Sequence, residues 1–266
     1  MGEIYPVSEK DYGGERIMLT NNTDYTLSIE DLTVSFDGFK AVDSLNFYLD
    51  KNELHVVIGP NGAGKTTVLD LICGKTKATS GSIKFLNKEL THLSEHEIVR
   101  QGVGRKFQTP SIYENLSVLE NLEVSYPHGR GVFSSLVFER DDTVTAKIHE
   151  IAKEIMLEDA LDTEAGFLSH GQKQWLEIGM LLIQDPQLLM LDEPVAGMSV
   201  KEREQTAVLL NKISQGRSVL VIEHDMDFVA RIAHKVTVLH QGKILATGDM
   251  ETVQKNPDVI EVYLGH

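Results

Sequence analysis

Residues 59–67 read Gly59-Pro60-Asn61-Gly62-Ala63-Gly64-Lys65-Thr66-Thr67 and fill every position of the phosphate-binding pattern G-x-x-x-x-G-K-S/T. The apolar run 54–58 precedes the pattern as a buried strand, and 67–72 follow it as a helix. Glycines let the backbone approach phosphates closely, and the N–H groups of the loop and of the helix start point at them. The whole run is therefore predicted to bind a nucleoside triphosphate, with Lys65 at the outer phosphates and Thr66 as a Mg²⁺ ligand.

Composition narrows the class of protein. The chain has 266 residues, 41% of them hydrophobic, which is enough for one large domain or for a core with an inserted subdomain. A net charge of -15 argues against a nucleic-acid partner and against direct adhesion to anionic lipid. No apolar run approaches the ~18 residues that a membrane span needs. We expect a cytoplasmic protein that other proteins hold at any membrane where it works, with its single cysteine, Cys73, packed in the core.

Apolar periodicity predicts the order of the elements. Alternation at 27–34 and 45–49 indicates half-buried, antiparallel strands, and helical spacing dominates from about 111 to 184. Buried strands then return at three places, 188–191, 219–222 and 236–239, and Gln241-Gly242 turns the last of them back as a hairpin. Strands that alternate with helices predict an α/β fold with a mixed, mostly parallel core sheet, an antiparallel β subdomain and an inserted α-helical subdomain. Residues 1–26 carry no such pattern and are predicted to be a tail.

A second acidic site follows the strand at 188–191. It consists of Asp192 and Glu193. Successive side chains along a strand point in opposite directions, so the two carboxylates are expected to have different roles. Asp192 is predicted to reach Mg²⁺ beside Thr66, and Glu193 to polarise the attacking water as general base.

The run Leu168-Ser169-His170-Gly171-Gln172 leads into a predicted helix at 170–183. With it, residues 27 to about 250 resemble the ATP-binding-cassette (ABC) ATPases, whose signature is L-S-G-G-Q. The resemblance implies ATP as substrate and a P-loop NTPase fold in one ABC ATPase domain at 27–266. In that domain 27–110 and 185–266 form the RecA-like core with the β subdomain, and 111–184 form the helical signature subdomain.

The family pattern implies roles for further residues. Gln108 is expected to sense Mg²⁺ and the γ-phosphate, His224 to bond the γ-phosphate and orient Glu193, and Phe36 to stack under adenine. The signature residues Ser169, Gly171 and Gln172 are expected to complete the site of the opposite subunit in a dimer that sandwiches two ATP molecules. The catalytic set is then Glu193, His224 and Gln108, and the metal set is Thr66, Gln108 and Asp192.

Four runs point to a subfamily. Gly104–Pro110 and Glu193–Met198 are similar to the branched-chain amino acid importers, and 168–180 with 108–116 are similar to the ATPase of the related urea importers. The resemblance implies a second ABC ATPase subunit, as homodimer or heterodimer, two membrane permeases that hold the chain at the inner face of the membrane, and an extracytoplasmic solute-binding protein. Urea uptake is the expected function. The alternatives are a branched-chain amino acid importer ATPase and a soluble ABC ATPase.

The sequence departs from the ABC pattern at two positions. His170 replaces the first glycine of the signature, and Ser199 stands where many cassettes have aspartate. We expect phosphate binding to survive the first change, because Ser169 and Gly171 resemble the phosphate contacts. The second change argues against an aspartate-based contact between subunits.

Overall fold

The computed structural model describes residues 25–106, 111–127 and 142–264. Its strands are β1 (Tyr25–Phe36), β2 (Phe39–Asp50), β3 (Leu54–Ile58), β4 (Ser80–Phe85), β5 (Lys88–Glu89), β6 (Val103–Lys106), β7 (Leu188–Asp192), β8 (Ser218–Ile222), β9 (Lys235–His240) and β10 (Lys243–Gly248). Its α-helices are α1 (Lys65–Ile72), α2 (Glu95–Arg100), α3 (Val118–Ser125), α5 (Asp142–Glu154), α6 (His170–Leu182), α7 (Val200–Ile213), α8 (Met226–Ile232), α9 (Met250–Lys255) and α10 (Pro257–Leu264). Two short 3-10 turns, η1 (Glu158–Ala160) and η2 (Ala165–Phe167), precede α6.

A six-stranded sheet forms the centre of the molecule. Its order is β10-β9-β3-β8-β7-β6, and every neighbouring pair is parallel except β9 with β10. β3, β7 and β8 are buried along their whole length, because other elements cover both faces of the sheet. This arrangement confirms the predicted α/β fold with a mixed, mostly parallel sheet.

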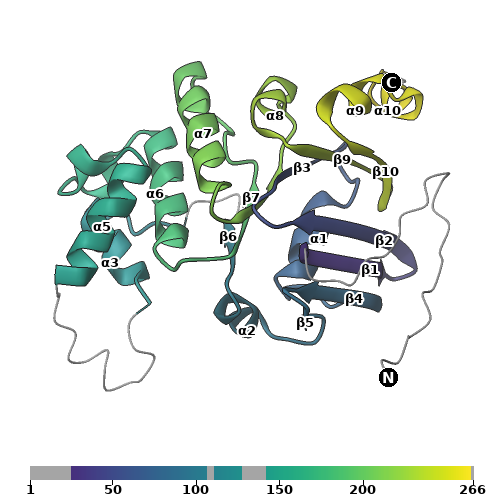
Figure 1. Ribbon diagram of the computed structural model, residues 1–266, viewed down its shortest axis with the longest axis horizontal. Coiled ribbons are helices and arrows are strands. Elements are labelled where there is room, and N and C mark those ends of the chain that lie inside the picture. Colours follow the sequence, from purple (N-terminus) through teal and green to yellow (C-terminus); the bar gives the residue numbers. More distant parts are fainter. Residues whose placement is uncertain (1–24, 107–110, 128–141, 265–266) are drawn as a thin grey trace, which may run out of the picture.

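The central sheet separates two apolar cores. Side chains alternate between its faces, so Val56 and Ile58 of β3 pack with the core of the helical layer, whereas Val57 packs with α1 and the second sheet. That second sheet has the order β2-β1-β4-β5 and is antiparallel throughout, as predicted. In Figure 1 it lies on one side of the central sheet, and α3, α5 and α6 lie on the other.

The first strand begins earlier than the alternation pattern predicts. β1 starts at Tyr25 rather than Leu27, so part of the predicted tail 1–26 belongs to the sheet. Thr26 occupies a polar position of the alternation, one residue before Leu27, yet it is buried and its Oγ1 shares a 2.7 Å hydrogen bond with Ser218 Oγ of β8. A polar position of the pattern can therefore be buried as well, when its side chain has a hydrogen-bond partner.

The predicted hairpin between β9 and β10 is confirmed. Gln241 and Gly242 both have positive φ, 50° and 76° respectively, as the two central residues of a type I′ turn require. The predicted helix at 170–183 is also observed, as α6. Among the helices of the described ranges, none combines the length and the apolar content needed to cross a membrane.

Candidate functional site

The phosphate loop begins where β3 ends, beside the ends of two parallel strands. β8 pairs with β3 and β7 pairs with β8, so the loop from Gly59, the pair Asp192-Glu193 and the segment from Glu223 leave the sheet at one edge. The carboxyl edge of a parallel sheet is where ligands bind in open α/β folds. The structure thus brings together the phosphate loop and the acidic pair, which are far apart in sequence.

The loop itself is packed tightly at its first residue. A Cβ on Gly59 would lie 2.2 Å from the carbonyl oxygen of Leu239 in β9, so no side chain fits there. α1 then begins at Lys65, with Gly64 as N-cap at φ 101° and no side chain capping the helix start. Its first N–H groups are therefore available to an anion. The other predicted phosphate contacts lie in the same loop and first turn, and they are Pro60, Asn61, Gly62, Ala63 and Thr67.

Lys65 folds back over the loop. Its Nζ donates to the carbonyl oxygens of Gly59 at 2.8 Å and Pro60 at 3.0 Å. Partial burial lowers the pKa of Lys65, while the carboxylates of Glu193 and Asp192 oppose that shift. The ammonium is thus bound to the loop and interacts electrostatically with the acidic pair, so it supplies positive charge where a triphosphate would need it.

Thr66 and Asp192 meet as predicted for a metal pair. The Thr66 hydroxyl donates to Asp192 Oδ2 at 3.3 Å, and Asp192 is almost fully buried. Burial raises the pKa of Asp192, and Arg105 opposes the shift. Asp192 Oδ1 is buried and has no hydrogen-bond partner among the described residues. Because a buried acceptor normally has a partner, this oxygen fits a hard divalent cation such as Mg²⁺.

Glu193 and His224 face each other across the same edge. Glu193 Oε1 lies 3.7 Å from His224 Nδ1, and the imidazole is 67% exposed. Glu193 has a φ of 47°, which is unusual for a residue with a side chain, and its N–H donates to Ile222 O at 2.9 Å. That hydrogen bond holds the turn that presents the carboxylate to solvent. A base and an imidazole in this arrangement can orient a water molecule for attack on a phosphoryl group.

Glu223 is a site residue that the sequence reasoning missed. It is buried next to His224, and its carboxylate accepts from the N–H groups of His224 at 2.9 Å, Val195 at 3.3 Å and Asp225 at 3.4 Å. Burial raises the pKa of Glu223, and these backbone donors oppose the shift. One carboxylate therefore fixes the turn after Glu193 to the turn that carries His224. The sequence does contain a signal for Glu223, because it is a charged residue directly after an apolar strand.

The signature residues form the start of α6. Ser169 is the N-cap, and its Oγ accepts from Gln172 N at 3.2 Å while Gln172 Oε1 accepts from Ser169 N at 2.9 Å. Gln172 was predicted to contact nucleotide, but here its side chain completes a capping box. Gly171 lies buried in the first turn of the helix.

His170 connects the signature to the loop after Glu193. Its Nε2 lies 3.0 Å from the carbonyl oxygen of Ala196, to which it donates. Ser199, at the end of that loop, caps α7 by accepting from Glu202 N at 3.3 Å. Both departures from the ABC pattern thus have defined local partners.

Two further predictions concern Phe36 and Gln108. Phe36 ends β1 in a tight hairpin opposite Phe39, and the two residues are 50% and 69% exposed. Rings this exposed are available to a flat ligand and do not fill a core. Gln108, predicted as a sensor of Mg²⁺ and phosphate, lies outside the described residues.

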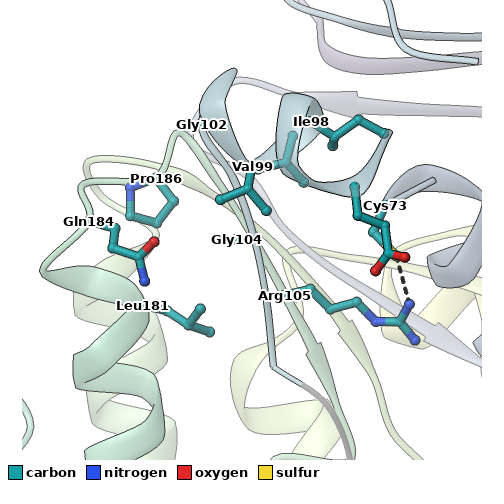
Figure 2. A pocket seen from close by; sticks show the side chains of 11 residues that line it. Cys73, Ile98, Val99, Gly102, Gly104, Arg105, Leu181, Gln184 and Pro186 are labelled. Carbon is teal, nitrogen blue, oxygen red and sulfur yellow. Dashed lines mark hydrogen bonds between the residues drawn. The ribbon is translucent and has the colours of Figure 1, made fainter. Parts of the chain in front are cut away.

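A pocket of about 220 Å³ opens between α2, β6 and the end of α6. Figure 2 shows Val99, Arg105 and Leu181 among the side chains around it. The Arg105 guanidinium donates to Asp70 Oδ1 at 2.6 Å and to Cys73 Sγ at 3.0 Å, which ties β6 to α1. Cys73 is buried in the core, as predicted.

A phosphate loop at the edge of a parallel sheet, an acidic pair on a neighbouring strand and a second helix start that carries the signature define a P-loop ATPase cassette. Comparisons with known proteins agree with this class. The family model described as "ABC transporter" matches residues 42–196, and the model "Branched-chain amino acid ATP-binding cassette transporter" matches 243–266. The chain belongs to the ABC transporter family, as an ATP-binding subunit of the branched-chain amino acid transporter group.

Two curated relatives illustrate the match. The chain is 36% identical to the high-affinity branched-chain amino acid transport ATP-binding protein BraF of Pseudomonas aeruginosa, over 90% of this chain and 97% of that protein. It is also 36% identical to the corresponding protein LivG of Escherichia coli, with the same coverage. These names favour the branched-chain amino acid alternative over the expected urea.

Solved structures match over nearly the whole fold. An ATP-binding cassette of an ABC transporter in its ADP conformation has a TM-score of 0.80 and 31% identity, and the match covers 91% of this chain and 99% of that chain. The cbiO1 protein of Clostridium perfringens, part of the ABC transporter complex cbiONQ, has a TM-score of 0.76 and 27% identity over 91% and 96% of the two chains. The chain is therefore an ABC ATPase that hydrolyses ATP.

Proposed function

We propose that this chain energises an importer of branched-chain amino acids by hydrolysing ATP between two cassettes. The observation that carries the proposal is the convergence of Lys65, Asp192, Glu193 and His224 on one edge of the central sheet. The names of the relatives support the solute.

Each residue at the edge has a distinct task in the proposed reaction. The loop 59–67 and Lys65 hold the phosphates, and the exposed ring of Phe36 stacks on the adenine. Glu193 accepts a proton from the attacking water, and His224 orients that carboxylate and contacts the γ-phosphate. Water adds to the γ-phosphorus as the bond to the bridging oxygen of ADP breaks, so that phosphate and ADP leave.

Thr66, Asp192 and Gln108 are the proposed Mg²⁺ ligands, directly or through water. The buried, unpartnered Oδ1 of Asp192 supports this set. When bound, Mg²⁺ neutralises charge on the β- and γ-phosphate oxygens.

The signature residues Ser169 and Gly171 are proposed to contact ATP held by a second cassette. Their helix start offers N–H donors, while the chain already has a phosphate loop of its own at α1. The pocket beside Arg105 is proposed to receive a permease segment, which would place the chain at the cytoplasmic face of a membrane. An extracytoplasmic solute-binding protein completes the proposed importer.

Urea is the second candidate solute. The sequence runs 168–180 and 108–116 favour it, because they are similar to the ATPase of urea importers. In the proposed importer the solute contacts the permeases and the solute-binding protein, so those partners decide between the two solutes.

Replacement of Glu193 by glutamine tests the proposed mechanism. The amide keeps the shape of the side chain but cannot take a proton, so ATP binding is retained while kcat falls about 100-fold or more. ATP hydrolysis and nucleotide affinity are measured on the same preparations. Equal turnover in the variant and the parent would exclude Glu193 as base.

Solute uptake by cells grown under limiting nitrogen tests which solute the transporter imports. The gene is deleted in the source organism and restored as the parent or as Glu193→Gln, and uptake of labelled leucine and of urea is measured. Loss of leucine uptake that only the parent restores supports the branched-chain proposal. A defect confined to urea supports the second candidate, and unchanged uptake of both would reject the importer proposal for these solutes.

A further inference from the structure

Glu202 of α7 contacts the signature motif within the same chain. Its Oε1 accepts from the Ser169 hydroxyl at 3.0 Å, and its Oε2 accepts from Ser199 N at 2.9 Å and from Ser199 Oγ at 2.8 Å. The Ser199 and Ser169 donors, together with the Gly171 backbone, hold the pKa of Glu202 below its usual value. One carboxylate thus lies at the starts of two helices, α6 and α7.

The two helix starts explain why the carboxylate is stable in this place. Each helix begins with N–H groups that have no partner within the helix backbone and with the positive end of its dipole, and both favour an anion. At α7, Glu202 is the third helical residue and completes a capping box with Ser199. At α6, the same side chain supplies the negative charge that the motif is otherwise expected to take from ATP.

The space at Gly171 fits this close approach. A Cβ on Gly171 would lie 2.4 Å from Glu202 Oε1, so the glycine leaves room for the carboxylate beside the helix backbone. Ser169 has only one hydroxyl proton, which points to Glu202, while its oxygen accepts from Gln172 N. The hydroxyl cannot donate to a phosphate while it donates to Glu202.

We propose that Glu202 is an internal competitor for the signature anion site, and that the γ-phosphate of ATP on a second cassette must displace it from Ser169 and Gly171. This inference rests on the proposed two-cassette function. A carboxylate and a phosphate at one pair of donors repel each other, so both cannot occupy the motif. Glu202 therefore raises the ATP concentration at which two cassettes close.

The decisive variant is Glu202→Gln in the complete transporter, purified through a tag on this chain. Glutamine also serves in capping boxes, so α7 keeps its start while the competing charge is removed. We expect the ATP concentration for half-maximal hydrolysis to fall about 2- to 5-fold, the range for an exposed charged contact, with kcat maintained.

Glu120→Gln is the matched control. Glu120 is the third residue of α3 and forms the same capping box with Ser117, but in a helix that lacks the signature. This variant should leave the ATP dependence unchanged. An unchanged or higher half-maximal ATP concentration in Glu202→Gln, relative to the parent, would overturn the competition.

Hydrogen exchange on the free chain tests the contact without any hydrolysis. Glu202→Ala should speed amide exchange in the segment 169–172, whereas Ser199→Ala, which removes the α7 cap and keeps Glu202, should not. Unchanged exchange in Glu202→Ala would refute the inference. A parent transporter that fails to hydrolyse ATP would instead refute the proposed function, and the exchange result would still decide whether Glu202 occupies the motif.

Discussion

The buried ion pair between Lys106 and Glu177 offers the sharpest test of how the central sheet is joined to the helical layer. Lys106 ends β6 and Glu177 lies on α6, with Nζ and Oε2 3.5 Å apart and side-chain exposures of 0% and 6%. Glu177 Oε1 also accepts from Ser111 N at 3.3 Å. The carboxylate therefore contacts residues on both sides of 107–110.

Glu177→Gln keeps the size of the side chain and leaves the Lys106 ammonium without its nearest counter-charge. Breaking a buried pair by removing one partner costs ~3–5 kcal/mol. The carboxylates of Asp192 and Glu223 also interact with Lys106, so we expect a loss near ~3 kcal/mol. Replacing both residues by methionine removes both charges, and such replacements of similar volume are often neutral or stabilising.

The loss of folding stability in Glu177→Gln should also depend on pH. Burial lowers the pKa of Lys106 from its ordinary value of 10.5, so the folded chain binds its proton less tightly than the unfolded chain does. Stability linked to such a group rises with pH in the window between its folded and unfolded pKa. The deficit of Glu177→Gln should therefore shrink as the pH is raised from neutral toward 10.

Urea denaturation at fixed pH measures these free energies, with Asp185→Asn as control. Asp185 forms an exposed ion pair with Arg217 at 3.3 Å, which also joins the end of the helical layer to the core. Its loss should cost less than ~1 kcal/mol. A loss in the double methionine variant as large as that in Glu177→Gln, or a loss below ~1 kcal/mol in Glu177→Gln, would refute the reasoning.

Three further predictions follow from single contacts. Lys65→Ala should abolish measurable ATP affinity, because it removes the cation over the loop, and micromolar binding by calorimetry would contradict the assignment. Thr206→Val should cost ~1–3 kcal/mol in urea denaturation, because the buried Trp175 Nε1 loses its 2.8 Å acceptor, while Trp175→Phe in the same background should make that loss smaller. Glu223→Gln places an amide against backbone N–H donors, so kcat should fall about tenfold with ATP affinity retained, and an unchanged kcat would remove Glu223 from the site.

Much of the fold could be predicted from local patterns. The strands at 54–58, 188–191 and 219–222 are short apolar runs, and such runs are buried on both faces of a parallel sheet whatever their neighbours are. β6 was missed because its last residues, Arg105 and Lys106, are charged. Their charges are matched by Asp70 and Glu177, which lie on helices far along the chain. No window of sequence around β6 contains those partners.

The sequence by itself determined the phosphate loop, because glycine spacing, a preceding strand and a following helix are properties of one continuous segment. It also determined the acidic pair Asp192-Glu193 and the helix start at Ser169, for the same reason. Only the tertiary structure decided which groups meet at the sheet edge. Glu223 joins two turns, and Glu202 lies on the signature of its own chain, because parallel pairing and helix packing bring together donors and acceptors that no sequence spacing relates.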